Sequence, residues 1–142
     1  FAERADGGRA VAQMAANAQF SEIGKAFVTH YYQAFDASIE QRATLQGLYQ
    51  NESMLTFENE QFMGMQAIMT KLTTLQFQTV QHQPTTTDCQ PTRDNGIVVF
   101  VTGKLAVDGG TNPLMFSQTF VLYPTPAGSW YIHNDMFRLN YS

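Results

Sequence analysis

Three histidines, one cysteine and a late aspartate are the side chains of this sequence best suited to catalysis or metal binding. His30, His82 and His133 lack the i, i+4 spacing with which a helix presents two ligands to one metal ion. A lone histidine without an evident partner is uninformative, so we expect structural or solvated roles for all three. Asp135 would act as a base where a pocket raised its pKa. The sequence therefore predicts neither a metal site nor a cofactor.

The single cysteine, Cys89, excludes an intrachain disulfide and indicates a reducing compartment, the cytosol or the nucleus. No basic residue adjoins it in sequence, which favours a structural role over a nucleophilic one. The net charge is −4 and the eight Lys and Arg residues are scattered, which argues against nucleic acid and suits a basic protein surface as partner. The sequence has no run of about 18 apolar residues, the length of a membrane span, and no apolar core in residues 1–13, so neither a membrane span nor a secretory signal is expected.

The composition predicts one globular domain behind a short tail. Of 142 residues, 44% are hydrophobic and only 14% are charged. Eleven Phe and six Tyr exceed the needs of a minimal core and indicate a cavity or an interface. Residues 1–16 are expected to form a flexible tail, of which residues 1–13 precede an expected natural start at Met14, and residues 17–142 are expected to form the domain.

Helical periodicity marks three segments in the first half of the chain. An apolar stripe with spacings of three and four begins behind Asn17, a residue that can cap a helix, and ends at Asp36. Shorter helices are predicted over residues 40–49 and 65–75. The long stripe consists of Phe20, Ile23, Phe27, Tyr31 and Phe35.

Elsewhere the apolar period is two, which predicts strands. Helices followed by mostly antiparallel strands give an α+β domain with the helices on one face of the sheet. Strands of roughly ten residues exceed the usual ~5–6, and a long twisted sheet that curls over a helix leaves a pocket open at one end. The predicted strands are 54–58, a short one at Phe62, 77–83, 96–107, 114–123 and 130–139, with turns at 51–53, 84–95, 108–113 and 124–129.

Four segments, in unbroken order from about Phe20 to Ser142, resemble one known family, nuclear transport factor 2. Any one of them would be a weak signal, whereas the ordered set is specific. The family's first helix is similar to FSEIG at 20–24 with HYYQAFD at 30–36, its first strand to NESMLTFE at 51–58, its third strand to LQFQTVQH at 75–82, and its last strand to NDMFRLNYS at 134–142.

The resemblance implies a cone-shaped domain in which a curved antiparallel sheet packs over a long N-terminal helix, and which forms a homodimer through its sheet. It implies no enzymatic activity, and a place in the cytoplasm, the nucleus and the nuclear pore. The implied function is an adaptor that carries Ran-GDP into the nucleus and binds FxFG repeats of nucleoporins. In the family, an aromatic side chain of Ran enters an apolar cavity, and basic residues of Ran meet carboxylates on its rim.

The resemblance places Phe57 and Glu58 at this cavity. Adjacent strand residues point to opposite faces unless the strand ends or bulges. Phe57 is therefore expected at the mouth, with Glu58 reaching the rim from a strand end. Without the resemblance, the usual burial of these residue types would favour the alternative, a Phe in the core followed by a solvent-exposed Glu. Many family members carry Trp where this chain has Phe57, so its ring offers less area and no indole donor.

Four apolar residues are expected in the cavity wall, although composition alone describes them as core. Filling the cavity with one ring contributes ~1.5–3 kcal/mol, whereas an exposed ion pair on the rim gives ~0.2–1 kcal/mol. Insertion of the ring should therefore dominate the affinity. The four residues are Phe62, Leu75, Val80 and Phe137.

The loop at Asp108 is where the family clusters acidic residues that meet Ran. In this chain no second carboxylate follows, because Gly109, Gly110, Thr111 and Asn112 come next. An Asp-Gly pair is also good turn chemistry for a hairpin, which is an equally weighted alternative. The missing carboxylate should weaken the salt-sensitive part of Ran binding. Alternatively, Glu60 or Asp36 compensates for it, and the sequence does not decide between these two.

Three further residues are assigned to other partners. Phe20 begins the apolar stripe of the first helix and occupies a position where many relatives have an aromatic residue for nucleoporin repeats. Phe100 and Met136 are candidates for the dimer face, because Phe and Met suit adaptable apolar interfaces. Core packing is the alternative for this last pair.

Two rival functions fit the same residues. The cone-shaped fold also hosts ketosteroid isomerases and dehydratases, which use a pocket Asp with Tyr or His partners, and here Asp135 and His133 would supply them. A closed cavity with an inward Asp would favour this small-molecule isomerase or dehydratase, and an open apolar mouth with carboxylates would favour the adaptor. The other rival is a scaffold module of mRNA-export or RNA-granule proteins.

Overall fold

The computed structural model describes residues 19–140, so the expected tail at 1–16 and the cap at Asn17 lie outside the described residues. No helix in the described range is both long and apolar enough for a membrane span. The elements in chain order are α2 (Phe20–Ala37), α3 (Ile39–Ala43), the 3-10 helix η1 (Thr44–Leu48), β1 (Tyr49–Phe57), β2 (Glu60–Met63), α4 (Met65–Thr73), β3 (Val80–Pro91), the 3-10 helix η2 (Arg93–Asn95), β4 (Ile97–Val107), β5 (Leu114–Pro124) and β6 (Trp130–Asn140).

The strands form one six-stranded sheet in the order β2-β1-β6-β5-β4-β3. Neighbouring strands are antiparallel except for β1 and β6, which run parallel. The α+β class is confirmed, but the prediction of an antiparallel sheet is wrong for this pair. Leu55 of β1 pairs with Asp135 of β6. A contact so distant in sequence leaves no mark on the apolar pattern of either strand.

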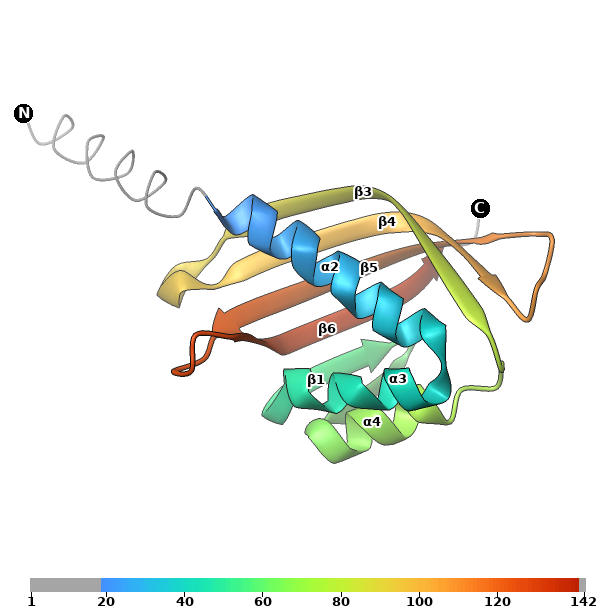
Figure 1. The fold of residues 1–142 in the computed structure, drawn as a ribbon, viewed down its shortest axis with the longest axis horizontal. Coiled ribbons are helices and arrows are strands. Elements are labelled where there is room, and N and C mark those ends of the chain that lie inside the picture. The colour runs from blue at the N-terminus through green and yellow to red at the C-terminus, as the bar shows by residue number, and fades with distance from the viewer. Residues whose placement is uncertain (1–18, 141–142) are drawn as a thin grey trace, which may run out of the picture.

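The long helix α2 lies across the hollow face of the curved sheet, and α3 and α4 lie beside β1 at one end (Figure 1). The predicted apolar stripe of α2 is the side of this helix that faces the sheet. Tyr31 is 1% exposed and meets Phe120 of β5 edge to face, with 4.9 Å between the ring centroids. Phe27 packs on the same ring at 5.4 Å. The core therefore lies between this helix and the inward residues of the strands.

The predicted turn at residues 51–53 is wrong, because these residues lie within β1. They occupy an irregular stretch of pairing between Tyr49 and Met54. Within it, the Ser53 hydroxyl donates to the Ile132 carbonyl at 2.5 Å and accepts from the Gln50 amide at 2.8 Å. Polar residues that resemble a turn in the sequence thus satisfy the backbone hydrogen bonds of a bulged strand.

The single helix predicted over residues 40–49 is divided in the structure into two short helices, α3 and η1.

The predicted turn at residues 84–95 is also wrong, because β3 continues to Pro91. Since β3 is an edge strand, Pro84 can lie in it without removing a hydrogen bond from a central ladder. Its pairing with β4 is irregular between Pro84 and Thr86. There the backbones approach so closely that a Cβ on Gly103 would lie 2.8 Å from Pro84 Cα. Figure 1 shows β3 bending over the end of the sheet.

Candidate binding cavity

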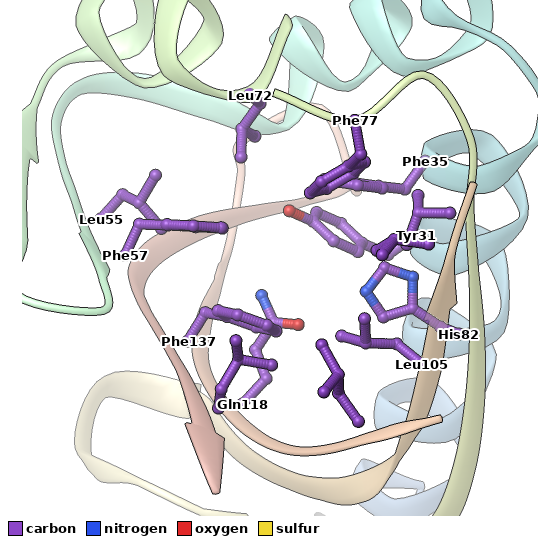
Figure 2. Close-up of a pocket in the computed structure, with 14 residues that line it drawn as sticks. Tyr31, Phe35, Leu55, Phe57, Leu72, Phe77, His82, Leu105, Gln118 and Phe137 are labelled. Carbon is purple, nitrogen blue, oxygen red and sulfur yellow. The ribbon is translucent and has the colours of Figure 1, made fainter. Parts of the chain in front are cut away.

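An apolar cavity of about 180 Å³ lies between α2 and the sheet, at the end where β1, β4 and β6 finish (Figure 2). Its walls come from α2, α4 and every strand except β2. Leu114, which is 38% exposed, lies on its border with solvent. The protein's own side chains therefore leave a hollow here that is open to a visiting group.

Three of the predicted site residues line this cavity: Phe57, Val80 and Phe137. The rings of Phe57 and Phe137 stack with 4.9 Å between centroids and form one wall. The prediction that Phe62 and Leu75 line the cavity is wrong. Neither residue is among those that line it. Both are partly buried and pack against the core, Phe62 from β2 and Leu75 from beyond the end of α4.

Glu58 follows the last residue of β1 and has the positive φ of 59°, so the strand ends there as expected. Its amide donates to the Phe137 carbonyl at 2.9 Å. Its Oε1 accepts from the Leu139 amide, while Oε2 has no hydrogen-bond partner among residues 19–140. Glu58 thus joins the end of β1 to the end of β6, beside the lining residues Phe57, Phe137 and Leu139.

Lys71 lies on the same rim, a position the sequence analysis missed. Its Nζ is 2.7 Å from Glu60 Oε1 and 5.3 Å from the centroid of the Phe57 ring. Phe62 lies under the same ammonium group at 5.7 Å. Glu60 is therefore neutralised locally. The Glu60 side chain is nevertheless 62% exposed.

Asp108 forms the turn that the alternative interpretation of its loop predicted. Asp108 and Gly109 have φ values of 51° and 71°, and the Gly110 amide donates to the Val107 carbonyl, as in a type I′ turn. In addition, Asp108 Oδ1 accepts from the amides of Gln78 and Thr79 at 2.8 and 3.0 Å. Its carboxylate thereby holds the segment that begins β3 against the end of β4.

Asp36 does not lie free on the rim, because it pairs with His82 of β3. Its two oxygens contact the His82 backbone amide and His82 Nδ1, each at 2.7 Å. The His82 side chain is 5% exposed and lines the cavity, stacked on Tyr32 with 4.3 Å between centroids. This pair could not be predicted from sequence, because its members lie 46 residues apart on different elements.

Asp135 lies behind the cavity, at 1% exposure, and is not part of its lining. Burial raises the pKa of its carboxyl to about 6, although hydrogen bonds from Gln118, Tyr49 and Tyr31 oppose the shift. These donors lie at 2.8, 2.8 and 3.5 Å. Tyr31 and Gln118 separate the acid from the cavity, so no oxygen of Asp135 faces a ligand as a general base would.

Several other lining residues were not predicted as part of the site. Phe77 was assigned to a strand but lies in the segment before β3. The alternating pattern of β4, β5 and β6 marks its apolar members as inward residues, but not as those that border an unfilled space. The unpredicted residues include Phe77, His82, Leu105, Val107, Leu114 and Gln118.

Phe20 lies at the opposite end of the sheet. It borders a second hollow, a groove of about 300 Å³ between the start of α2 and the ends of β3 and β5. Ile23, Pro124 and Trp130 are among the other lining residues. This position separates Phe20 fully from the cavity.

Phe100 and Met136 lie on the outer face of the sheet, 42% and 51% exposed. Both are paired in register with Thr119 of β5, on its two sides. Core packing, the alternative weighed for these two residues, is therefore wrong.

The helix, the curved sheet and the hollow between them define a small cone-shaped α+β domain with an apolar cavity. The family model of the nuclear transport factor 2 domain matches residues 23–139. The chain is 51% identical over 121 residues to nuclear transport factor 2B of Arabidopsis thaliana, covering 84% of this chain and 94% of the relative. It is 48% identical over 124 residues to nuclear transport factor 2 of Saccharomyces cerevisiae, covering 87% and 96%.

Among solved structures, nuclear transport factor 2 from Cryptosporidium parvum superposes with a TM-score of 0.81 at 51% identity, covering 86% of this chain and 95% of that one. The chain belongs to the nuclear transport factor 2 family. It is accordingly a nuclear transport factor and not an enzyme of the same fold.

Proposed function

We propose that this protein carries Ran-GDP into the nucleus by taking an aromatic side chain of Ran into the cavity. Membership of the transport factor family supports the function. The observation that carries the mechanism is the unfilled hollow of about 180 Å³ walled by Phe57 and Phe137. A cavity of about 150 Å³ is large enough to bind benzene, so one ring fits here.

We infer which carboxylates contact basic residues of Ran from those that no other side chain among residues 19–140 occupies. Asp36 is occupied by His82, and Glu60 by Lys71. Glu58 and Asp108 each use one oxygen inside the protein and keep the other for basic residues of Ran. We therefore infer that these two acids select the partner, and that neither Asp36 nor Glu60 replaces the carboxylate missing from the loop.

The remaining surfaces fit the other proposed partners. The groove at Phe20 would take the aromatic side chains of FxFG nucleoporin repeats. The outer face of the sheet, with Phe100 and Met136 exposed, would form the homodimer. With these partners, we propose that the protein acts at the nuclear pore and in the cytoplasm and nucleus on either side.

The direct test is a titration of this protein with Ran loaded with GDP or with a non-hydrolysable GTP analogue. We expect binding to the GDP form only. Tight binding to neither form, or equal binding to both, would contradict the proposal. An FxFG peptide titrated in parallel verifies that the protein is folded and measures the groove separately.

A further inference from the structure

The ring of His82 presents one nitrogen to the interior of the cavity (Figure 2). Nδ1 faces Asp36 Oδ1 at 2.7 Å. Because an ionised carboxylate only accepts hydrogen bonds, this contact keeps the proton of a neutral imidazole on Nδ1. Nε2 is then an acceptor. It has no hydrogen-bond partner among residues 19–140, although the side chain is only 5% exposed.

The other polar groups of the cavity wall are already bonded within the protein. The Tyr31 hydroxyl lies 2.9 Å from that of Tyr49. Gln118 Oε1 accepts from Tyr32 at 2.7 Å, and its Nε2 donates to Asp135 at 2.8 Å. His82 Nε2 is therefore a ring nitrogen of an otherwise mostly apolar wall that has no hydrogen-bond partner among residues 19–140, and Asp36 fixes its direction from behind.

An acceptor that faces an apolar cavity favours a ligand that brings a donor, because a ligand without one would cover the nitrogen and leave it unbonded, which costs about 1–3 kcal/mol. The hollow of about 180 Å³ accommodates a single substituted ring. We propose that the cavity also binds free small aromatic molecules that carry a hydrogen-bond donor, of the phenol class, with His82 Nε2 as the acceptor and Asp36 as the residue that fixes its tautomer. Such a molecule would occupy the space proposed above for the aromatic side chain of Ran.

The first test compares phenol with toluene, which has nearly the same shape and no donor. Both are titrated by calorimetry against the full chain and against His82→Phe, which keeps a ring but removes the acceptor. The ratio of phenol affinity to toluene affinity should fall by roughly tenfold in the variant. An unchanged ratio would overturn the proposal, as would failure of phenol to bind the unaltered protein.

Asp36→Asn tests the tautomer while keeping the size of the side chain. The Asn carbonyl can still accept from the His82 amide, and its NH₂ group would donate to Nδ1, which moves the imidazole proton to Nε2. Anisole, which only accepts hydrogen bonds, should then gain affinity relative to phenol. A merely structural role for Asp36 would weaken both ligands alike, which is the contrary result.

A spectroscopic measurement on the unaltered protein keeps the proposal testable if either variant fails to fold. The ¹⁵N resonance of His82 Nε2 should shift on adding phenol and remain in place on adding toluene. Phenol that binds without moving this resonance would refute the assignment.

This inference does not depend on Ran binding, because the small molecules are measured on the free protein. Saturating phenol is then added to a Ran-GDP titration. Phenol binding without competition would count against Ran's use of the cavity and leave the phenol site intact. Ran binding without any phenol binding would contradict the phenol site and leave the proposed use of the cavity by Ran intact.

Discussion

The cavity and the groove at Phe20 lie at opposite ends of one sheet and are built differently: the cavity is almost wholly apolar, whereas Gln19 and Asn95 are among the residues that line the groove. The cavity is walled by inward residues of packed elements, whereas the groove lies among the ends of elements. Around the cavity, Asp36, Glu58 and Asp108 each accept a hydrogen bond that joins two chain segments. A cavity whose walls are held by such hydrogen bonds suits a single ring in one orientation. An open groove suits weak contacts with repeated aromatic residues.

The comparison also separates two uses of a carboxylate. Sequence reasoning treats acids near a binding loop as contacts for a basic partner. Here the acids first hold the cavity together, and only their remaining oxygens face outward. A substitution that removes the charge while keeping an acceptor therefore distinguishes recognition from architecture, and the variants below use this difference.

The largest effect is expected from Glu58→Lys. It places a cation before basic residues of Ran and removes the acceptor for the Leu139 amide. Ran-GDP affinity should fall by more than about a hundredfold, because like charges at an interface cost several kcal/mol. FxFG peptide binding at the distant groove should be unchanged. Glu58→Gln, which keeps the acceptor, is the matched control. Its loss should be smaller and should measure the charge alone, whereas equal losses in both variants would contradict this division.

Asp135→Asn tests the polar layer behind the cavity. The pKa of Asp135 is about 6 in the folded protein, against an ordinary value of 3.8. At a pH between these two values, the folded protein keeps a proton on Asp135, whereas the unfolded chain has released it. Stability should therefore fall as pH rises from about 4 to about 6, by up to ~3 kcal/mol. The Asn variant should lack this part of the pH dependence. Urea unfolding across this range measures it, and parallel curves for both proteins would contradict the assignment.

Phe57→Ala removes half of the stacked wall at the mouth. Losing most of one ring's burial corresponds to about 1.5–3 kcal/mol, or roughly ten- to a hundredfold in Ran-GDP affinity. Binding of the FxFG peptide should be unaffected. Phe20→Ala should give the opposite pattern, and measuring both ligands on both variants by calorimetry completes the comparison. Loss of the same ligand in both variants would mean that the two sites are not independent.

Asp108→Asn should have the smallest effect. The Asn carbonyl can still accept from the amides of Gln78 and Thr79, so only the charge is lost. An exposed ion pair of ~0.2–1 kcal/mol corresponds to at most about a fivefold loss of Ran-GDP affinity. Because salt screens exposed charges, the difference should shrink as ionic strength rises. A loss that persists in high salt would indicate damage to the turn instead.

Much of the fold followed from local patterns. Spacings of three and four located α2, and alternation located β4, β5 and β6 nearly to their ends. The errors arose where tertiary position overrides local preference. Pro84 is tolerated because β3 lies at an edge, and the polar residues before Met54 form a bulge in β1. The parallel pairing of the first long strand with the last could not be predicted, because it joins the two ends of the domain.

The sequence by itself determined the kind of site, an aromatic-rich hollow under a curved sheet with Phe57 and Glu58 at a strand end. Only the tertiary structure decided which groups are free to act there. Asp36, Asp108 and Glu58 find their hydrogen-bond partners 46, 30 and 81 residues away. A side chain's type and its neighbours in sequence set what it can bind. Packing, however, brings a donor from a distant part of the chain, and the hydrogen bond to that donor uses one or both oxygens of the carboxylate.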